Sequence, residues 1–242
     1  MKHPLGLVSV SFREHTPEEI LKAMKETPLT CIEWGSDVHC PPQKAEEIAA
    51  LQKQYGIECC SYGTYFRLGV TPMEELPQYI RAAKALGTDI LRLWCGNKNS
   101  EDYSHAEKET LFALCRQAAE TAEREGVLLC MECHIKTFTN RKEAALELMA
   151  AVDSPHFQMY WQPNQFHTEE ENMEYAQAIA PYTKRIHIFN WKEKEKFPLA
   201  EGTETWQNYL TAFESQPLLL EFMPDGTIES LPAEAESLRK LI

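Results

Sequence analysis

Ionisable and amide side chains follow several short apolar runs in this sequence, in places where water would not reach them. The residues are Glu132, His134, Gln162, His187 and Glu221, and the runs are VLLCMECH, FQMYWQ, RIHIFNW and PLLLEF. A carboxylate at the end of a buried strand is costly unless a cation or hydrogen bonds compensate it. Two such glutamates with a histidine between them therefore predict a shared site, built around a divalent metal ion.

The two glutamates suit proton transfer next to a carbonyl group. Glu132 or Glu221 would remove a proton from carbon, the other group would return or relay it, and a metal would polarise the carbonyl. Carboxylate, imidazole and amide groups are ligands for Mn²⁺, Mg²⁺, Co²⁺ or Zn²⁺. The alternative is structural, with both glutamates paired to Arg92 or Lys136 inside the protein and no chemistry.

Hydroxyl, aromatic and cationic residues follow other apolar runs and suit a polyol substrate. The segment SYGTYFR (61–67) offers all three kinds of side chain, and Arg67 or Arg92 could bind a phosphate or carboxylate unless each forms a structural ion pair. The strand-end tryptophans could line a sugar or simply pack at the rim. The candidate substrate contacts are His39, Tyr62, Tyr65, Arg67, Arg92, Trp94, His134, Trp161, Asn190 and Trp191.

Strand-like and helix-like patterns alternate eight times along the chain. The strand-like runs are LGLVSVSF, TCIEW, IECCSY, DILRLW, VLLCME, FQMYWQ, RIHIFN and LLLEF, and apolar residues recur at spacings of three and four between them. Thr or Asn precedes Glu by three residues at four expected helix starts, namely Thr16, Thr71, Asn140 and Thr168. Glycine follows three expected helices, at 56, 87 and 126.

Eight such units in 242 residues predict one α/β domain over 1–242, a parallel (β/α)8 TIM barrel. An open doubly wound sheet is the alternative, but no glycine-rich phosphate loop follows any strand. In a barrel the C-terminal strand ends form the active site, and alternation then points Arg92, Glu132 and Glu221 at its mouth. The same alternation places Cys130 and Cys133 on opposite faces of a strand, which argues against a zinc site formed by this pair. The charged run 191–197 is expected to be a solvated loop, or a lid.

The composition restricts the partners. The formal net charge is −13, from 24 Lys and Arg and 37 Asp and Glu, which argues against general nucleic-acid binding. We find no signal peptide and no membrane-spanning run, and eight scattered cysteines favour a reducing cytoplasm. We expect a small-molecule sugar or sugar phosphate as the partner, with no nucleic acid and no membrane. Self-association into a homo-oligomer stays open.

At these residues the chain resembles the sugar phosphate isomerase/epimerase family, the xylose-isomerase-like TIM barrels. The similar segments are IEWGSDVH, SYGTYFRLG, LRLWCGN, MECHIKTFTN, YWQP, HIFNW and LLEF. The resemblance implies one divalent metal held by Glu132, Gln162, His187 and Glu221, with the two glutamates as the acid/base pair. Gln162 stands where the family has Asp, and an amide oxygen brings no charge, so metal affinity is expected to be lower or the metal absent.

Three functions remain open from the sequence. The first is a metal-dependent isomerase or epimerase of a monosaccharide or sugar phosphate. The second is a lyase or dehydratase acting on a polyol acid with the same site, and the third is a non-catalytic sugar-binding protein. DNA-repair endonucleases share the fold, but they need further His and carboxylate ligands and a less acidic surface.

Overall fold

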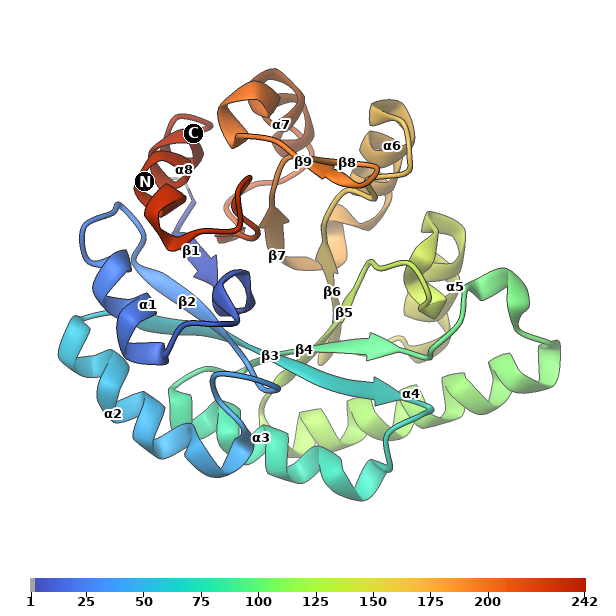
Figure 1. Cartoon of the computed structure of the whole chain (residues 1–242). Helices are drawn as coiled ribbons and strands as arrows, with labels where there is room; N and C mark the ends of the chain where they lie inside the picture. Colours follow the sequence, from blue (N-terminus) through green and yellow to red (C-terminus); the bar gives the residue numbers. More distant parts are fainter. Residues whose placement is uncertain (1–2) are drawn as a thin grey trace.

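Eight parallel strands close into a barrel in the computed structural model, which describes residues 3–242 (Figure 1). The order around the ring is β1, β10, β7, β6, β5, β4, β3, β2. The strands are β1 (Leu5–Val8), β2 (Cys31–Gly35), β3 (Glu58–Leu68), β4 (Ile90–Cys95), β5 (Leu128–Glu132), β6 (Phe157–Trp161), β7 (Thr183–Ile188) and β10 (Leu218–Leu220). The prediction of a (β/α)8 TIM barrel is confirmed.

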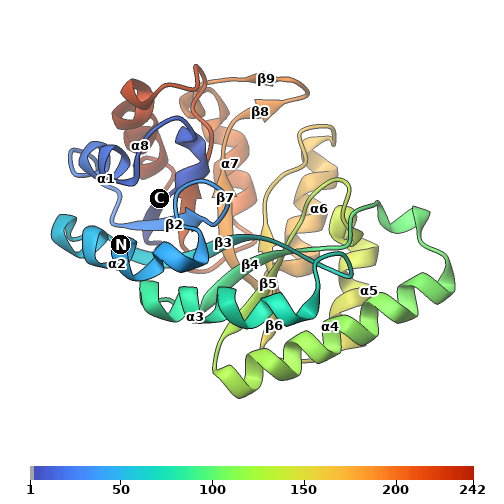
Figure 2. The ribbon, with the colours of Figure 1, turned by 60° about the horizontal axis from the view of Figure 1, so that its bottom comes forward.

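Helices surround the barrel as an outer layer, as Figures 1 and 2 show. They are α1 (Pro17–Met24), α2 (Ala45–Tyr55), α3 (Leu76–Leu86), α4 (His105–Glu125), α5 (Lys142–Val152), α6 (Glu169–Ile179), α7 (Thr203–Leu210) and α8 (Leu231–Arg239). Each strand end is therefore followed by a loop and a helix that covers the outside of the sheet. This arrangement gathers the C-terminal strand ends at one mouth.

Local capping signals account for several helix ends. Thr16 and Thr168 form the predicted capping boxes, and Ser104 forms one that we had not predicted. The expected caps at Thr71 and Asn140 are wrong, because Thr71 Oγ1 accepts from the backbone N–H of Arg67 and the Asn140 side chain accepts from that of Ser100.

The three predicted C-terminal glycines, at 56, 87 and 126, adopt the left-handed backbone conformation. A glycine pays little in strain at such a position because it has no Cβ. These helices therefore end where the sequence indicates, directly before β3, β4 and β5.

Two strand boundaries differ from the sequence prediction. β1 ends at Val8 and the chain turns into a 3-10 helix over Ser9–Phe12, where Ser9 Oγ accepts a hydrogen bond from the Gly35 backbone. β3 continues to Leu68, so the segment 61–67 belongs to the strand instead of following it. The pairing of β3 with β4 is irregular between Gly63 and Arg67, so residues 64–66 fall outside the regular register.

The interior has two apolar regions, one between barrel and helices and one inside the barrel. The smaller, inner region contains Val8, Val10, Cys31, Ile90, Cys130, Tyr160 and Leu219. Cys130 belongs to this inner region and Cys133 to the outer one, which confirms that they face opposite sides of β5. All eight cysteines are free thiols.

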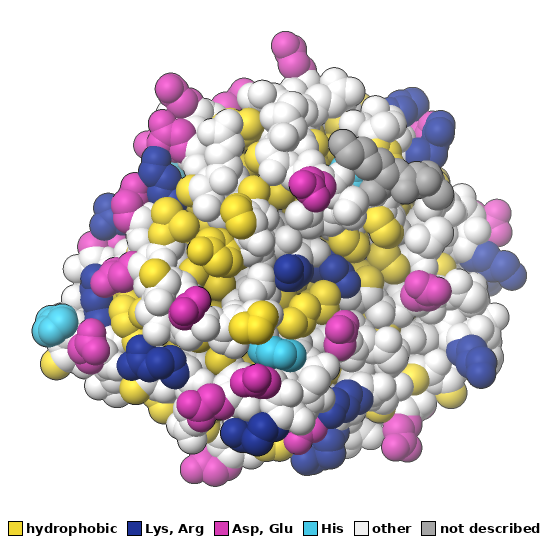
Figure 3. Space-filling view, turned by 180° about the vertical axis from the view of Figure 1, so that it is seen from behind, with side chains coloured by type: hydrophobic (Ala, Val, Ile, Leu, Met, Phe, Trp, Pro, Cys, Tyr) yellow, Lys and Arg dark blue, Asp and Glu magenta, His cyan; other side chains and the backbone are white. Residues whose placement is uncertain are grey.

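A short antiparallel hairpin follows β7, formed by β8 (Trp191–Lys192) and β9 (Glu195–Lys196). Figure 2 shows it projecting beyond the barrel. The segment 191–197 lies in the connection between β7 and α7 and its residues 192–195 are exposed, as expected of a solvated loop, and it carries this hairpin in addition. Figure 3 shows, on the face seen from behind, apolar patches on either side of basic side chains near the centre, with acidic and basic side chains interspersed around them. Within residues 3–242, no helix is long and apolar enough to cross a bilayer.

Candidate active site

His187 lies at the centre of the candidate site, on β7, and is 1% exposed. Its Nδ1 atom is 3.0 Å from Oε1 of Gln162, 3.4 Å from Oε2 of Glu221 and 3.6 Å from Oε1 of Glu132. Glu132 is the last residue of β5, and Gln162 and Glu221 directly follow β6 and β10. The fold thus brings the other three residues of the expected ligand set to one nitrogen atom of His187.

Glu132 is held by two donors from β4. Its Oε2 atom accepts hydrogen bonds from Nη1 of Arg92 and from Nε1 of Trp94. Its other oxygen, Oε1, faces His187. The predicted structural pairing of Glu132 with Arg92 therefore exists, but it occupies only one of the two carboxylate oxygens.

Glu33 completes the site, although it was not among the predicted site residues. It is fully buried in the middle of β2, where its Oε1 accepts a 2.8 Å hydrogen bond from Nε of Arg92 and its Oε2 accepts a 2.9 Å bond from Ser61 Oγ. The alternation of side chains along the segment CIEW (31–34) could have identified Glu33 as a site residue, because Cys31 and Glu33 share the face that points into the barrel. Arg92 thus pairs with two glutamates and is not a free anion-binding group.

Gly63 makes room for this ion pair. It pairs with Arg92 in the β3–β4 register, and a Cβ atom there would lie 2.6 Å from Oε1 of Glu33 and 2.8 Å from Nη2 of Arg92. Any larger residue would push the two charged groups apart. The ion pair between Arg92 and Glu33 therefore requires a residue without a side chain at position 63 of β3.

Opposite charges override burial in setting the ionisation of these groups. Burial alone would raise the pKa of Glu33, but the charges of Arg92 and His187 hold it at about 2. Burial likewise opposes ionisation of Glu132, yet Arg92 and His187 keep its pKa well below the usual range. Burial would lower the pKa of His187, and the carboxylates of Glu221 and Glu33 raise it well above the usual range. Without a metal ion, the protonated form of His187 is therefore favoured, and a metal ion that binds Nδ1 would have to displace the proton there.

The donor set fits a divalent metal ion in its chemistry and charge. Ligand atoms that share one ion at about 2.0–2.2 Å lie roughly 3 Å or more from one another, which is the spacing of the three oxygens from Nδ1 of His187. With His187 neutral, three buried glutamates and one arginine leave two negative charges uncompensated. Among residues 3–242, however, no three His, Cys, Asp or Glu side chains form a preformed metal cluster. Gln162 and a small movement of the glutamates would have to complete the coordination.

Four predicted substrate contacts lie together at the β3–β5 side of the mouth, and all are half-buried. The ring of Trp94 is central, with the Arg67 guanidinium carbon 4.0 Å from its centroid and the rings of Tyr65 and His134 at 5.1 and 5.4 Å. Nη1 of Arg67 also donates to the Gly96 carbonyl, 3.0 Å away. Burial lowers the pKa of Arg67, and the Glu132 charge partly offsets this.

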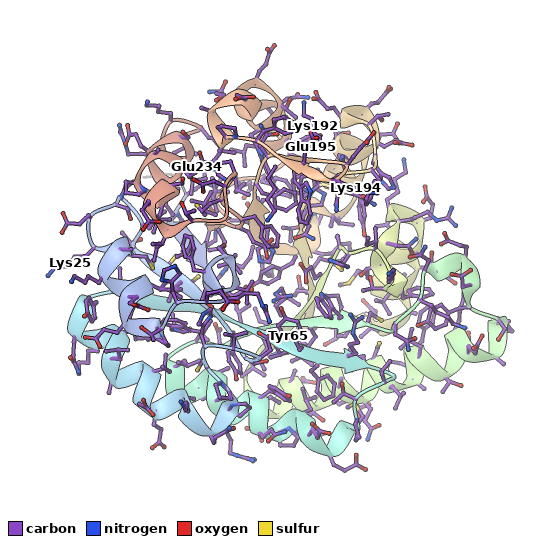
Figure 4. All side chains as sticks on the ribbon, viewed as in Figure 1. Lys25, Tyr65, Lys192, Lys194, Glu195 and Glu234 are labelled. Atoms are coloured by element: carbon purple, nitrogen blue, oxygen red, sulfur yellow. The ribbon has the colours of Figure 1, made fainter. Side chains whose placement is uncertain are left out.

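Asn190 and Trp191 lie on the opposite side, where the hairpin leaves β7. Nδ2 of Asn190 donates a 2.9 Å hydrogen bond to the Pro198 carbonyl, and the Trp191 ring packs 5.1 Å from that of Phe222, the residue after Glu221. Both line a cavity of about 240 Å³. Figure 4 labels Tyr65 on β3 and Lys192, Lys194 and Glu195 on the hairpin, beside α6 and α7. The mouth is thus bordered by aromatic rings on both sides.

Three predicted substrate contacts face away from the mouth, which corrects their assignment. The imidazole of His39 is buried against Ser9 Oγ and the Phe12 carbonyl, at 3.0 and 3.2 Å. Tyr62 points to the helix layer, where its hydroxyl donates to the Cys40 carbonyl. Trp161 packs against Trp206, Tyr209 and Phe213. Tyr62 and Trp161 alternate with inward-facing neighbours on β3 and β6, so these two side chains belong to the outer core, whereas His39 is buried in the turn that follows β2.

The comparison with family profiles matches residues 10–240, nearly the whole chain, to the xylose isomerase-like TIM barrel. The chain belongs to this family. A curated relative, the 3-dehydroshikimate dehydratase of Bacillus anthracis, is 23% identical over 124 residues. That match spans 49% of this chain and 42% of the relative, so it covers less than half of either protein.

Solved structures of the xylose isomerase-like family superpose on the full barrel. The probable 3-DHS dehydratase AsbF of Bacillus anthracis, involved in petrobactin synthesis, is 19% identical with a TM-score of 0.79, covering 99% of both chains. The 3-keto-D-glucoside 4-epimerase YcjR of E. coli is 14% identical with a TM-score of 0.72, also covering 99% of both. A family protein of Mycobacterium smegmatis, in complex with magnesium, has 12% identity and a TM-score of 0.72, covering 99% of this chain and 96% of that one. These likenesses show the shared fold, and the relatives with named activities are enzymes.

Proposed function

We propose that this protein is an isomerase or epimerase of a monosaccharide or sugar phosphate, acting by proton transfer next to a carbonyl. The convergence of Glu132 and Glu221 on Nδ1 of His187 carries the proposal. The two glutamates come from strands that lie three apart in the ring, so they can approach a substrate from different sides. Two carboxylates on different sides of one carbon are what an epimerisation requires.

Glu132, Gln162, His187 and Glu221 would hold a divalent ion in this proposal. The ion would polarise the substrate carbonyl and stabilise the negative charge that develops on its oxygen. It would also neutralise the two excess negative charges of the buried cluster. Gln162 would supply an uncharged oxygen ligand. Glu33 is the third carboxylate of the cluster, besides Glu132 and Glu221.

The two glutamates differ in their surroundings, and this suggests a division of roles. Glu132 accepts hydrogen bonds from Arg92 and Trp94, which stabilise its ionised form and make it a weak base. Among the described residues, Glu221 accepts no side-chain hydrogen bond from Arg92 or Trp94, and its ion-pair partner is His187. We therefore assign the initial proton abstraction to Glu221, with Glu132 as the second member of the pair.

Arg67 is the cation best placed to bind an anionic group of the substrate. It stacks on Trp94 at the mouth, and no carboxylate lies within ion-pair distance of it in the part of the chain that the structure describes. Arg92 is already committed to Glu33 and Glu132. A phosphate or carboxylate on the substrate would therefore meet Arg67, while the aromatic rings contact its apolar faces.

A dehydratase of a polyol acid is the second candidate. It is favoured by the named activity of the curated relative and by Arg67, which suits a substrate carboxylate. The same base would remove the proton next to the carbonyl, and a protonated hydroxyl group would then leave as water. A non-catalytic sugar-binding protein is the third candidate, and the second experiment below separates it from the two enzymes.

The first experiment measures bound metal by mass spectrometry after purification with Mn²⁺, Zn²⁺, Co²⁺ and Mg²⁺ supplied. We expect about one ion per chain in the wild type, a strong loss in Glu221→Ala, and no loss in Glu195→Ala, an exposed glutamate on the hairpin. A wild type without metal would contradict the metal-dependent mechanism.

The second experiment incubates the loaded protein in D₂O with keto-sugars, sugar phosphates and 3-dehydroshikimate. An isomerase or epimerase should exchange carbon-bound hydrogen for deuterium, and Glu221→Gln should lower that rate by about 10²–10⁴-fold. A conjugated, ultraviolet-absorbing product would instead favour the dehydratase. Ligand-induced thermal stabilisation without exchange or turnover would favour a binding protein.

A further inference from the structure

The two ring nitrogens of His187 face different surroundings. Nδ1 faces Gln162, Glu221 and Glu132, whereas Nε2 is buried without a hydrogen-bond partner among the described residues. Oε1 of Glu33 lies 3.5 Å from Nε2, within ion-pair distance. A neutral imidazole carries only one ring proton, so its position decides which nitrogen can bind a cation.

Glu33 has little freedom to move. Nε of Arg92 and Oγ of Ser61 hold its two oxygens, and Gly63 leaves just enough space for the carboxylate and the guanidinium. It is also fully buried, so substrate cannot reach it. Glu33 can therefore influence chemistry only through the groups that it contacts, and of these Arg92 and His187 reach the candidate metal site.

We propose that Glu33 is a positioning residue that keeps the ring proton of His187 on Nε2 and so leaves the lone pair of Nδ1 free for a divalent cation. A carboxylate behind a metal-binding histidine fixes both the tautomer and the orientation of the ring. This inference rests on the proposed function, because it assumes that Glu132, Gln162, His187 and Glu221 bind the ion.

The competing state is visible in the same geometry. With its proton on Nδ1, His187 would donate a 3.0 Å hydrogen bond to Oε1 of Gln162, and the lone pair needed by the cation would be occupied. The Nε2 lone pair would then face the negative charge of Glu33, which disfavours that state. Glu33 thus acts against a blocked form that the Gln162 amide would otherwise stabilise.

The test compares zinc affinity in the full-length wild type, Glu33→Gln and Ser61→Ala, by competition with a fluorescent chelator. Glu33→Gln should weaken zinc binding by about 10–100-fold, since it removes the charge behind Nε2. Ser61→Ala is the matched control, because it removes another partner of Glu33 but leaves the carboxylate in place, and it should bind zinc nearly as well as the wild type. Glu33→Asp, which keeps the charge, should recover part of the loss. Thermal unfolding without zinc checks that each variant is folded.

Nuclear magnetic resonance of ¹⁵N-histidine-labelled protein gives a readout that does not depend on activity. In the zinc-bound wild type, His187 should show a ligated Nδ1 and a protonated Nε2 that exchanges slowly with solvent. Ligation through Nε2, or a Glu33→Gln affinity equal to that of Ser61→Ala, would overturn the inference and leave the proposed function intact. A wild type that binds no zinc or other divalent ion would overturn both.

Discussion

Arg92 and Glu33 form a buried ion pair that spans the interior of the barrel from β4 to β2. Nε of Arg92 lies 2.8 Å from Oε1 of Glu33, and the two residues are 3% and 0% exposed. Because Arg92 also donates to Glu132, one guanidinium connects a fully buried carboxylate to a carboxylate of the candidate metal site. The charges deep in the barrel and those at its mouth therefore belong to one network.

Replacing Arg92 should destabilise the protein strongly. Arg92→Met would leave Glu33 and Glu132 buried without their cation, and breaking a buried pair in this way costs about 3–5 kcal/mol. The free energy of unfolding in urea measures the effect. Arg239→Met is the control, since it removes an exposed pair with Glu236 and should leave stability nearly unchanged. A loss in Arg92→Met as small as in this control would refute the network.

Gly63→Ala should disturb both stability and metal binding. The added methyl group would collide with Glu33 and Arg92, and overpacking of this kind costs about 1–3 kcal/mol. Gly6→Ala is a matched control, because its methyl group would collide with Cys31 and Leu219 inside the barrel, away from Glu33. Both variants should unfold more easily, and only Gly63→Ala should lose zinc affinity. Equal zinc affinities would contradict this expectation.

Arg67→Met should weaken the binding of anionic substrates. Loss of a charge-assisted contact of about 1.5–3 kcal/mol corresponds to a rise in KM of about 10–100-fold, with a smaller change in kcat. Arg67→Met should leave the KM for neutral analogues of the same substrate unchanged. The control variant Lys194→Met, on the exposed hairpin, should leave the KM for anionic substrates unchanged. Steady-state kinetics with a phosphorylated and an unphosphorylated sugar provide the comparison. A similar rise in KM for both sugars would assign Arg67 a structural role instead.

Glu234 should make the protein less stable as the pH rises. Burial, together with the charge of Asp225, raises the pKa of this carboxyl group on α8, although the Leu199 backbone N–H donates to it at 2.8 Å. Because the pKa of Glu234 is higher in the folded than in the unfolded protein, folding favours its protonated form. The stability that protonated Glu234 contributes is fully present below the unfolded-state pKa and is lost as the pH rises through the folded-state pKa.

Glu234→Gln keeps an acceptor for Leu199 but cannot ionise. Relative to the wild type it should therefore gain stability as the pH rises from about 4, near the ordinary pKa of a glutamate, towards neutrality. Chemical unfolding of both proteins across this range provides the measurement. A difference that stays constant with pH would show that the pKa of Glu234 is the same in the folded and the unfolded protein, which would contradict the raised pKa.

The barrel and the position of its mouth could be predicted because they follow from local patterns. Apolar runs with helical stretches between them specify parallel strands covered by helices, and glycine and threonine signals mark many of the helix ends. The same alternation brought Glu132, Gln162, His187 and Glu221 to the C-terminal strand ends, where the structure places them together. Their roles as metal ligands and acid/base groups remain predictions.

The direction of some side chains was harder to predict, because it depends on exact strand limits. Tyr62 and Trp161 were expected at the mouth, but the longer β3 and the regular β6 turn them toward the helices. Glu33 was overlooked as a site residue because it lies inside a strand and not at its end. A shift of one residue exchanges the two faces of a strand, so such errors move a side chain from the site to the outer core.

The sequence by itself determined the type of fold and the set of ionisable residues that the fold would collect, since both depend on local periodicity and on the cost of burying charge. Only the tertiary structure decided which charges meet. The pairing of Arg92 with Glu33 and Glu132, the space left by Gly63, and the opposite surroundings of the two His187 nitrogens all depend on contacts between strands far apart in the chain. Such contacts arise from closure of the barrel, which no local pattern specifies.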